Sequence, residues 1–176
     1  MSSFPADAIR SEFERAKKRK GQRVMIRLCV PAEIPVLIDL FRQSVRRGTV
    51  ADYSAAQRLA WAPDHIDGDA WAARCANRPT WVAEIAGTVT GFVDLESDGH
   101  IDMLFVHPEF HRQGIATALL AHVESEAQTQ GIKRLFAEVS LTARPVFEKA
   151  GFSVIEQQAV IRAAETLTNY RMQKPL

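Results

Sequence analysis

The stretch whose residue types could do chemistry covers residues 101–120, where a short apolar run gives way to a loop and then to helical spacing. The loop reads Arg112-Gln113-Gly114-Ile115-Ala116. The first N–H groups of a helix have no partner inside it and lie at its positive end, so successive amides there can hold a phosphate. Gly114 would let that phosphate approach the backbone, and Ala116 keeps a second position small. The predicted contacts are Arg112, Gln113, Gly114, Ile115, Ala116 and Thr117.

This pattern also fits an ordinary strand-to-helix turn, so its meaning depends on the elements around it. The run Ile101–Val106 is rich in branched and aromatic residues and predicts a strand, which Pro108 ends because proline has no N–H for a sheet ladder. After the loop, apolar residues recur with the helical period and predict a helix that ends near Gly131. A buried strand and a buried helix face would therefore hold the loop from both sides.

The rest of the chain alternates strands and helices. The predicted strands lie at residues 24–30, 80–84, 89–95, 134–140, 152–157 and 167–172, and the predicted helices begin at Pro31, within residues 48–78, and at Ala143. Residues 1–23 form a basic arm without an apolar face, and we expect them to be solvated. Residues 24–176 are predicted to form one domain.

Composition excludes several classes of protein. The 176 residues are 47% hydrophobic and carry a net charge of +1. This near-neutral charge argues against nucleic-acid binding as the main function. No apolar run reaches the length of a membrane helix, and no signal peptide is evident, so we expect a cytoplasmic protein without membrane contact. The two cysteines, Cys29 and Cys75, have no metal-type spacing and are expected to be reduced structural thiols.

Two further motifs accompany the loop at set distances. Val106-His107-Pro108 precedes it, and residues 143–152, Ala-Arg-Pro-Val-Phe-Glu-Lys-Ala-Gly-Phe, follow the helix. Together with the loop they resemble the GNAT superfamily of acyl-CoA-dependent N-acetyltransferases. The family's loop usually reads Arg/Gln-x-x-Gly-x-Gly/Ala, and here His111 takes the first place. The resemblance implies one α/β domain with a mixed, twisted sheet of about seven strands and helices on both faces.

The resemblance also implies acetyl-CoA as co-substrate. In the family the fourth and fifth strands splay apart, and the exposed edge, here Leu104, Phe105 and Val106, holds the pantetheine arm. Candidate counter-charges for the phosphates are Arg112, Arg144 and Lys149, and Thr142 stands where many relatives carry asparagine beside the pantetheine. A surface role for each of these charges is the alternative. His107 and His111 are four residues apart, but Pro108 lies between them, and we predict no metal.

The acceptor amine must lose a proton before it attacks the thioester. His100 and Asp102 would share one face of the fourth strand, and we take Asp102 as the candidate base, with Glu138 in reserve and a structural role as the alternative. Many relatives protonate the leaving thiolate with a tyrosine, but this chain has Phe147 at that place. The proton for the thiolate must then come from Tyr170, Tyr53 or solvent, and we predict that Tyr170 is the donor.

A helix face between the first two strands is the expected acceptor wall. Tyr53, Gln57 and Trp61 are spaced four residues apart, which predicts one helix face, with core packing as the alternative. This segment and Asn169-Tyr170-Arg171-Met172 are similar to the YafP-like branch of bacterial acetyltransferases. We predict acetyl transfer to a primary amine by direct attack in a ternary complex; the alternative is a non-catalytic acyl-CoA-binding sensor or interaction module. The oligomeric state is open, with a homodimer as one option.

Overall fold

The computed structural model describes residues 23–176, so the predicted basic arm lies outside the described residues except for Arg23. Five α-helices and seven strands follow one another within this range. The helices are α2 (Ile34–Gly48), α3 (Ala55–Trp61), α4 (Gly68–Asn77), α5 (Ile115–Thr129) and α6 (Arg144–Lys149), with short 3-10 turns η1 (Pro31–Glu33) and η2 (Pro108–Phe110). None of the helices among the described residues is long and apolar enough to cross a membrane.

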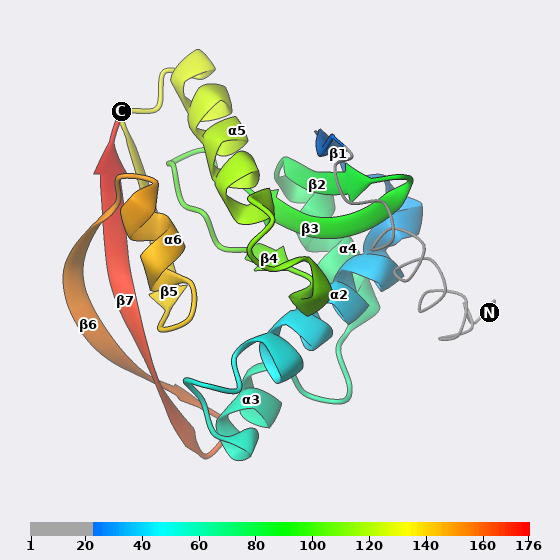
Figure 1. Cartoon of the computed structure of the whole chain (residues 1–176), viewed down its shortest axis with the longest axis vertical. Helices are drawn as coiled ribbons and strands as arrows, with labels where there is room; N and C mark the ends of the chain where they lie inside the picture. The colour runs from blue at the N-terminus through cyan, green and yellow to red at the C-terminus, as the bar shows by residue number, and fades with distance from the viewer. Residues whose placement is uncertain (1–22) are drawn as a thin grey trace.

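The seven strands form two antiparallel sheets. The first has the order β1 (Met25–Leu28), β2 (Thr80–Ile85), β3 (Thr88–Asp94), β4 (Leu104–Val106), and the second has the order β5 (Arg134–Ser140), β7 (Glu165–Pro175), β6 (Ser153–Arg162). Figure 1 shows the second sheet as a separate layer, in which the long β6 and β7 extend toward α3. The predicted α/β class with seven strands is confirmed, and the sheet is divided where the fourth and fifth strands meet.

A single parallel bridge joins the two sheets. It pairs His100 with Phe136, through bonds from Ile101 N–H to Phe136 O at 2.9 Å and from Phe136 N–H to Gly99 O at 3.0 Å. Gly99 has a φ of +95°, and a Cβ there would lie 2.0 Å from Arg134 O, so only glycine lets the chain come this close to β5. Beyond this bridge β4 has no strand on its second side within the described part of the chain.

Helices cover both faces of the first sheet. Along β2, Trp81, Ala83 and Ile85 pack into the cluster that contains the buried face of α5, whereas Val82 packs into the cluster of α2. In Figure 1, α5 and α2 accordingly lie on either side of β3 and β4. The loop between β4 and α5 thus joins a strand of the first sheet to the helix that packs on one of its faces.

The fourth strand is shorter than predicted, because a side chain replaces part of its ladder. The carboxylate of Asp94 accepts bonds from the N–H groups of Asp102 at 3.0 Å and Met103 at 2.7 Å. Asp94 is fully buried, and burial raises its pKa to about 6, against the opposing effects of these N–H bonds and of Arg78. The expectation that His100 and Asp102 share one face of a strand is therefore wrong, since residues 101–103 lie outside β4.

Candidate active site

The outer edge of β4 has no strand beside it among the described residues. Asp94 N–H bonds to Met103 O at 3.1 Å and His107 N–H to Thr90 O at 2.8 Å, and Phe105 pairs with Phe92. Because alternate residues of an antiparallel strand bond to the same neighbour, the peptide groups of Leu104 and Val106 point to the other edge. That edge is the one predicted to hold an extended pantetheine arm.

The loop that follows ends in a left-handed residue. Gly114 is the N-cap of α5 with φ 79° and ψ 3°, and a Cβ on it would meet no atom within 4 Å. The first helical bond runs from Ala118 N–H to Gly114 O, so the N–H groups of residues 115–117 precede the helical ladder. No acidic residue lies in the first turn, and the Ile115 side chain is buried. The helix start therefore presents three amides and open space beside Gly114.

The two loop histidines point to different partners. His107 is 3% exposed, and its Nδ1 accepts a bond from Glu109 N–H at 3.3 Å; burial lowers its pKa to about 4, so the ring is neutral near pH 7. The Nε2 of His111 lies 3.1 Å from Val106 O. Within residues 23–176 no group of three or more His, Cys, Asp and Glu side chains is arranged to hold a metal ion.

The predicted counter-charges have different surroundings. Arg112 is exposed in the loop, with a positive φ of 60°, and Lys149 is exposed at the end of α6. Arg144 bonds to Glu148 at 2.7 Å and stacks over the Tyr170 ring at 4.5 Å. Arg112 is thus the cation nearest in sequence to the three amides, whereas Arg144 is already engaged.

Thr142 and Phe147 also have partners in the fold. The Thr142 hydroxyl donates to Asp52 Oδ2 at 2.6 Å, so it links the end of β5 to the segment before α3. Phe147 is 3% exposed and packs edge-on against Phe152 with ring centroids 5.0 Å apart. The place of the family's usual tyrosine is therefore part of the hydrophobic core.

Tyr170 lies on the α6 side of the second sheet. It pairs in register with Val139, which is buried in the core cluster that α5 and α6 share. The cation of Arg144 covers its ring. β7 is adjacent to β5 in this sheet.

His100 lies between two carboxylates. Its Nε2 is 2.7 Å from Glu138 and its Nδ1 is 3.3 Å from Glu96, and the ring stacks on Phe136. Burial alone would lower the pKa of His100, but the hydrogen bond and charge of Glu138 outweigh it and raise that pKa. Both ring nitrogens face acceptors, so this environment favours the doubly protonated imidazolium.

Asp102 belongs to a cluster of ion pairs that the sequence did not reveal. Its Oδ2 lies 3.1 Å from Arg74 and 3.2 Å from Arg78, and Arg78 also contacts Asp94 and Glu96. The two arginines come from α4 and the residue after it. The structural role left open for Asp102 was the only expectation that pointed to this cluster, because its partners are distant in sequence.

The residues of the expected acceptor wall tie α3 to the second sheet. Tyr53 precedes the N-cap Ser54 and therefore lies outside α3. The prediction that Tyr53 shares a helix face with Gln57 and Trp61 is wrong. The Tyr53 hydroxyl donates to Thr168 O at 2.6 Å and accepts from Leu141 N–H at 2.9 Å. This hydroxyl therefore connects the segment before α3 to β5 and β7.

The other two residues of this group are also engaged. Gln57 completes the capping box of α3 and donates to Thr166 O at 2.8 Å. Trp61 packs edge-on against Tyr53 at 5.5 Å and against Phe105 of β4 at 6.3 Å. Trp61 and Phe105 are both partly exposed. Of the three rings Tyr53, Trp61 and Phe105, these two lie next to the β4 edge.

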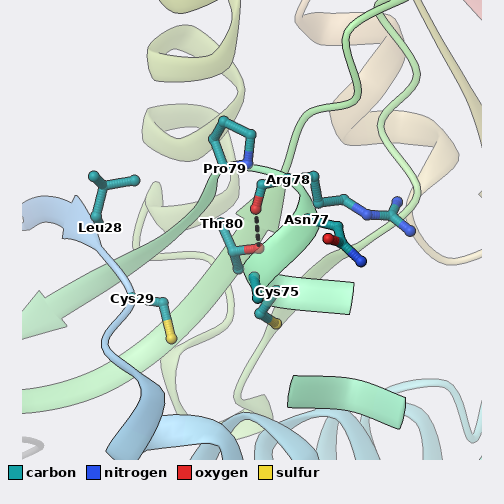
Figure 2. Close-up of a pocket in the computed structure, with 8 residues that line it drawn as sticks. Leu28, Cys29, Cys75, Asn77, Arg78, Pro79 and Thr80 are labelled. Atoms are coloured by element: carbon teal, nitrogen blue, oxygen red, sulfur yellow. Dashed lines mark hydrogen bonds between the residues drawn. The ribbon is translucent and has the colours of Figure 1, made fainter. Parts of the chain in front are cut away.

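A shallow hollow elsewhere on the molecule contains both cysteines. It is lined by residues from the end of β1, the end of α4 and the start of β2, including Cys29 and Cys75 (Figure 2), and by none from β4 or α5. Burial raises the pKa of the Cys29 thiol to about 12 and also raises that of Cys75. A thiol that stays protonated is a poor nucleophile, which argues against an acyl-enzyme formed on these residues.

The fold and the site together define an α/β protein with a splayed pair of strands, one of which leads through a loop to three helix-start amides outside the helical ladder. A family model for the acetyltransferase (GNAT) domain matches residues 49–174, and the chain belongs to the GNAT acetyltransferase family.

Three relatives extend this finding. The chain is 35% identical over 150 residues to the uncharacterized N-acetyltransferase YafP of Escherichia coli K12, covering 85% of this chain and 94% of that one. It is 31% identical to a GCN5-related N-acetyltransferase from Rhodopseudomonas palustris, with a TM-score of 0.84 over 90% of this chain and 99% of that one. The structure of yncA from Salmonella typhimurium with acetyl-CoA has the same fold, with 19% identity, a TM-score of 0.67 and coverage of 87% and 94%.

Proposed function

We propose that this protein transfers an acetyl group from acetyl-CoA to a primary amine, by direct attack of the amine in a ternary complex. The observation that carries the proposal is the continuity of the β4 edge with the α5 start: the outward-facing peptide groups of Leu104 and Val106 lead through the loop to the amides of residues 115–117. Such a path suits a ligand with a peptide-like arm and a pyrophosphate at its end. That yncA binds acetyl-CoA on the same fold supports this assignment.

The pyrophosphate would lie over the amides of residues 115–117 beside Gly114, with Arg112 as counter-charge. The pantetheine would run along the outer edge of β4, and the N–H of Leu104 would donate to the thioester carbonyl as negative charge develops there. Each of these contacts uses backbone groups. The departures of this sequence from the family pattern at His111 and Thr142 therefore leave the main cofactor contacts intact.

For the proton of the amine, the geometry favours Glu138 over Asp102. Asp102 Oδ2 already accepts from two arginines, so its role in the cluster is to hold residues 101–103. Glu138 is 41% exposed at its side chain, and its carboxylate lies 2.7 Å from His100 Nε2. We assign Glu138 as the proton acceptor, directly or through a water molecule, and His100 as the residue that positions it.

We assign Tyr170 as the proton donor to the leaving thiolate, as predicted from the sequence. We expect Tyr170→Phe to lower kcat by about 100-fold with little change in acetyl-CoA affinity, because the ring and its contact with Arg144 remain while the proton donor is lost. The measurement is steady-state kinetics together with calorimetry. Tyr53→Phe is the matched control: its hydroxyl bonds two main-chain groups, so we expect a lower melting temperature instead. Unchanged kcat in Tyr170→Phe would leave solvent as the proton donor.

A non-catalytic acyl-CoA sensor is the second candidate function, and the observation that favours it is the burial of Phe147 where relatives carry the acid. Incubation of the purified protein with acetyl-CoA and a panel of amines, peptide N-termini and lysine peptides separates the two functions. We expect release of free CoA that depends on the acceptor, with acetylated product seen by mass spectrometry. Tight acetyl-CoA binding without transfer to any acceptor would instead establish the sensor.

The cytoplasmic location and the homodimer stay predictions. β6 forms the outer edge of the second sheet and exposes Ile155 and Ile161, so a second copy would pair most readily there. Light scattering over a range of protein concentrations measures the mass in solution.

A further inference from the structure

The side chain of His111 meets the open edge of β4. Its Nε2 lies 3.1 Å from the carbonyl oxygen of Val106, one of the two residues whose peptide groups face away from β3. A carbonyl oxygen only accepts hydrogen bonds, so Nε2 must carry the hydrogen. The residue at the first place of the loop therefore donates to the strand on which the pantetheine would lie.

The Cε1–Nε2 edge of the ring also lies against the end of α2. A Cβ on Gly48, the last residue of α2, would lie 2.9 Å from His111 Cε1 and 3.5 Å from Nε2. Real Cβ atoms do not approach other atoms to within 2.9 Å, so the ring can occupy this place only because residue 48 has no side chain. His111 thus touches three separate elements: the loop that carries it, the β4 edge and the end of α2.

We propose that His111 is a positioning residue for the cofactor. Its side chain fixes the loop between β4 and α5 against α2, and it orients the Val106 carbonyl toward the pantetheine arm. The inference rests on the proposed function. A carbonyl oxygen has two lone pairs, so Val106 O can accept from His111 and from a pantetheine amide at the same time. Nothing in this geometry brings the imidazole to the thioester, so its effect falls on binding.

This role predicts a specific kinetic pattern. In His111→Ala the loop loses a hydrogen bond and a packing contact, and we expect the Kd and KM for acetyl-CoA to rise about tenfold while kcat stays within about twofold. His111→Gln keeps a donor at a similar reach and should recover part of the affinity. His65→Ala, which removes an exposed histidine from the segment between α3 and α4, is the matched control and should bind as the wild type does.

A second substitution tests the contact without removing the histidine. The backbone of Gly48 does not need a left-handed φ, so Gly48→Ala should be tolerated by α2 itself but displaces the ring. We expect Gly48→Ala to weaken acetyl-CoA binding as His111→Ala does, and to add nothing further in the double variant, because both remove the same contact. Additive effects would show that Gly48 acts independently of His111.

The experiment is titration calorimetry of the wild type and the five variants with acetyl-CoA, with thermal melting to verify that each is folded. If the wild type does not bind, the proposed function fails. If the wild type binds and His111→Ala binds equally well, only the positioning role is wrong. Tighter binding by His111→Ala would also overturn it, since the ring would then compete with the pantetheine for Val106.

Discussion

Replacing Gly114 with asparagine is expected to weaken acetyl-CoA binding by about 100-fold or more while the protein stays folded. Asparagine enters the left-handed region more readily than other side chains, so the φ of 79° is retained with little strain. Its side chain then fills the space beside Gly114 in which no protein atom lies within 4 Å of a Cβ. Displacing a phosphate from the amides of residues 115–117 removes charge-assisted hydrogen bonds worth about 1.5–3 kcal/mol each. Titration calorimetry measures the loss.

The matched control for this substitution is Gly87→Asn. Gly87 has a φ of +82° and equally open surroundings, but it lies in the turn between β2 and β3. Both variants should therefore carry the same small backbone strain and melt at similar temperatures, while only Gly114→Asn loses acetyl-CoA. Equal affinities in the two variants would place the phosphates elsewhere on the molecule.

The second large effect is expected for Glu138→Gln, with a fall in kcat of about 100- to 1000-fold at neutral pH and little change in acetyl-CoA affinity. Glutamine keeps the shape of the side chain but cannot accept the proton of the amine. Because the free amine becomes more abundant as the pH rises, the activity lost at pH 7 should partly return at high pH. A pH-rate profile with a saturating acceptor measures this change in shape.

Two comparisons make the result specific to Glu138. Glu156→Gln removes another exposed carboxylate that is paired with a cation, Arg171 on β7, and should leave the rate unchanged. Asp102→Asn should weaken the arginine cluster and lower the melting temperature, with a smaller loss of kcat. The opposite ranking, with Asp102→Asn inactive and Glu138→Gln active, would return the role of base to Asp102, as the sequence indicated.

The same variant tests the link between Glu138 and His100 without any turnover. The pKa of His100 is raised because Glu138 stabilises the imidazolium against burial. In Glu138→Gln that stabilisation is lost, so the His100 pKa should fall, which proton NMR of the ring follows directly. By linkage, the pair stabilises the folded protein below the ordinary histidine pKa, and this contribution disappears as the pH rises through the raised value. A His100 titration identical to wild type would show that the two side chains are not coupled.

The sequence alone determined the local parts of this protein. The strand before Pro108, the loop that contains Gly114 and the helix from Ile115 were predicted because each depends on residues a few positions apart. Strands β5 and β7 were predicted for the same reason, although β7 runs from Glu165 to Pro175 and so is longer than expected. These elements carried the resemblance to the family as well.

Only the tertiary structure decided which side chains are free to act. Tyr53 bonds to Thr168, 115 positions away, and Asp102 pairs with arginines 24 and 28 positions before it, so no local pattern could show that these groups have partners. The single bridge between the two sheets likewise depends on how closely Gly99 approaches β5. A hydroxyl or carboxylate has the same identity in the sequence whether it faces solvent or another residue, and its chemistry is set by the partner that folding brings to it.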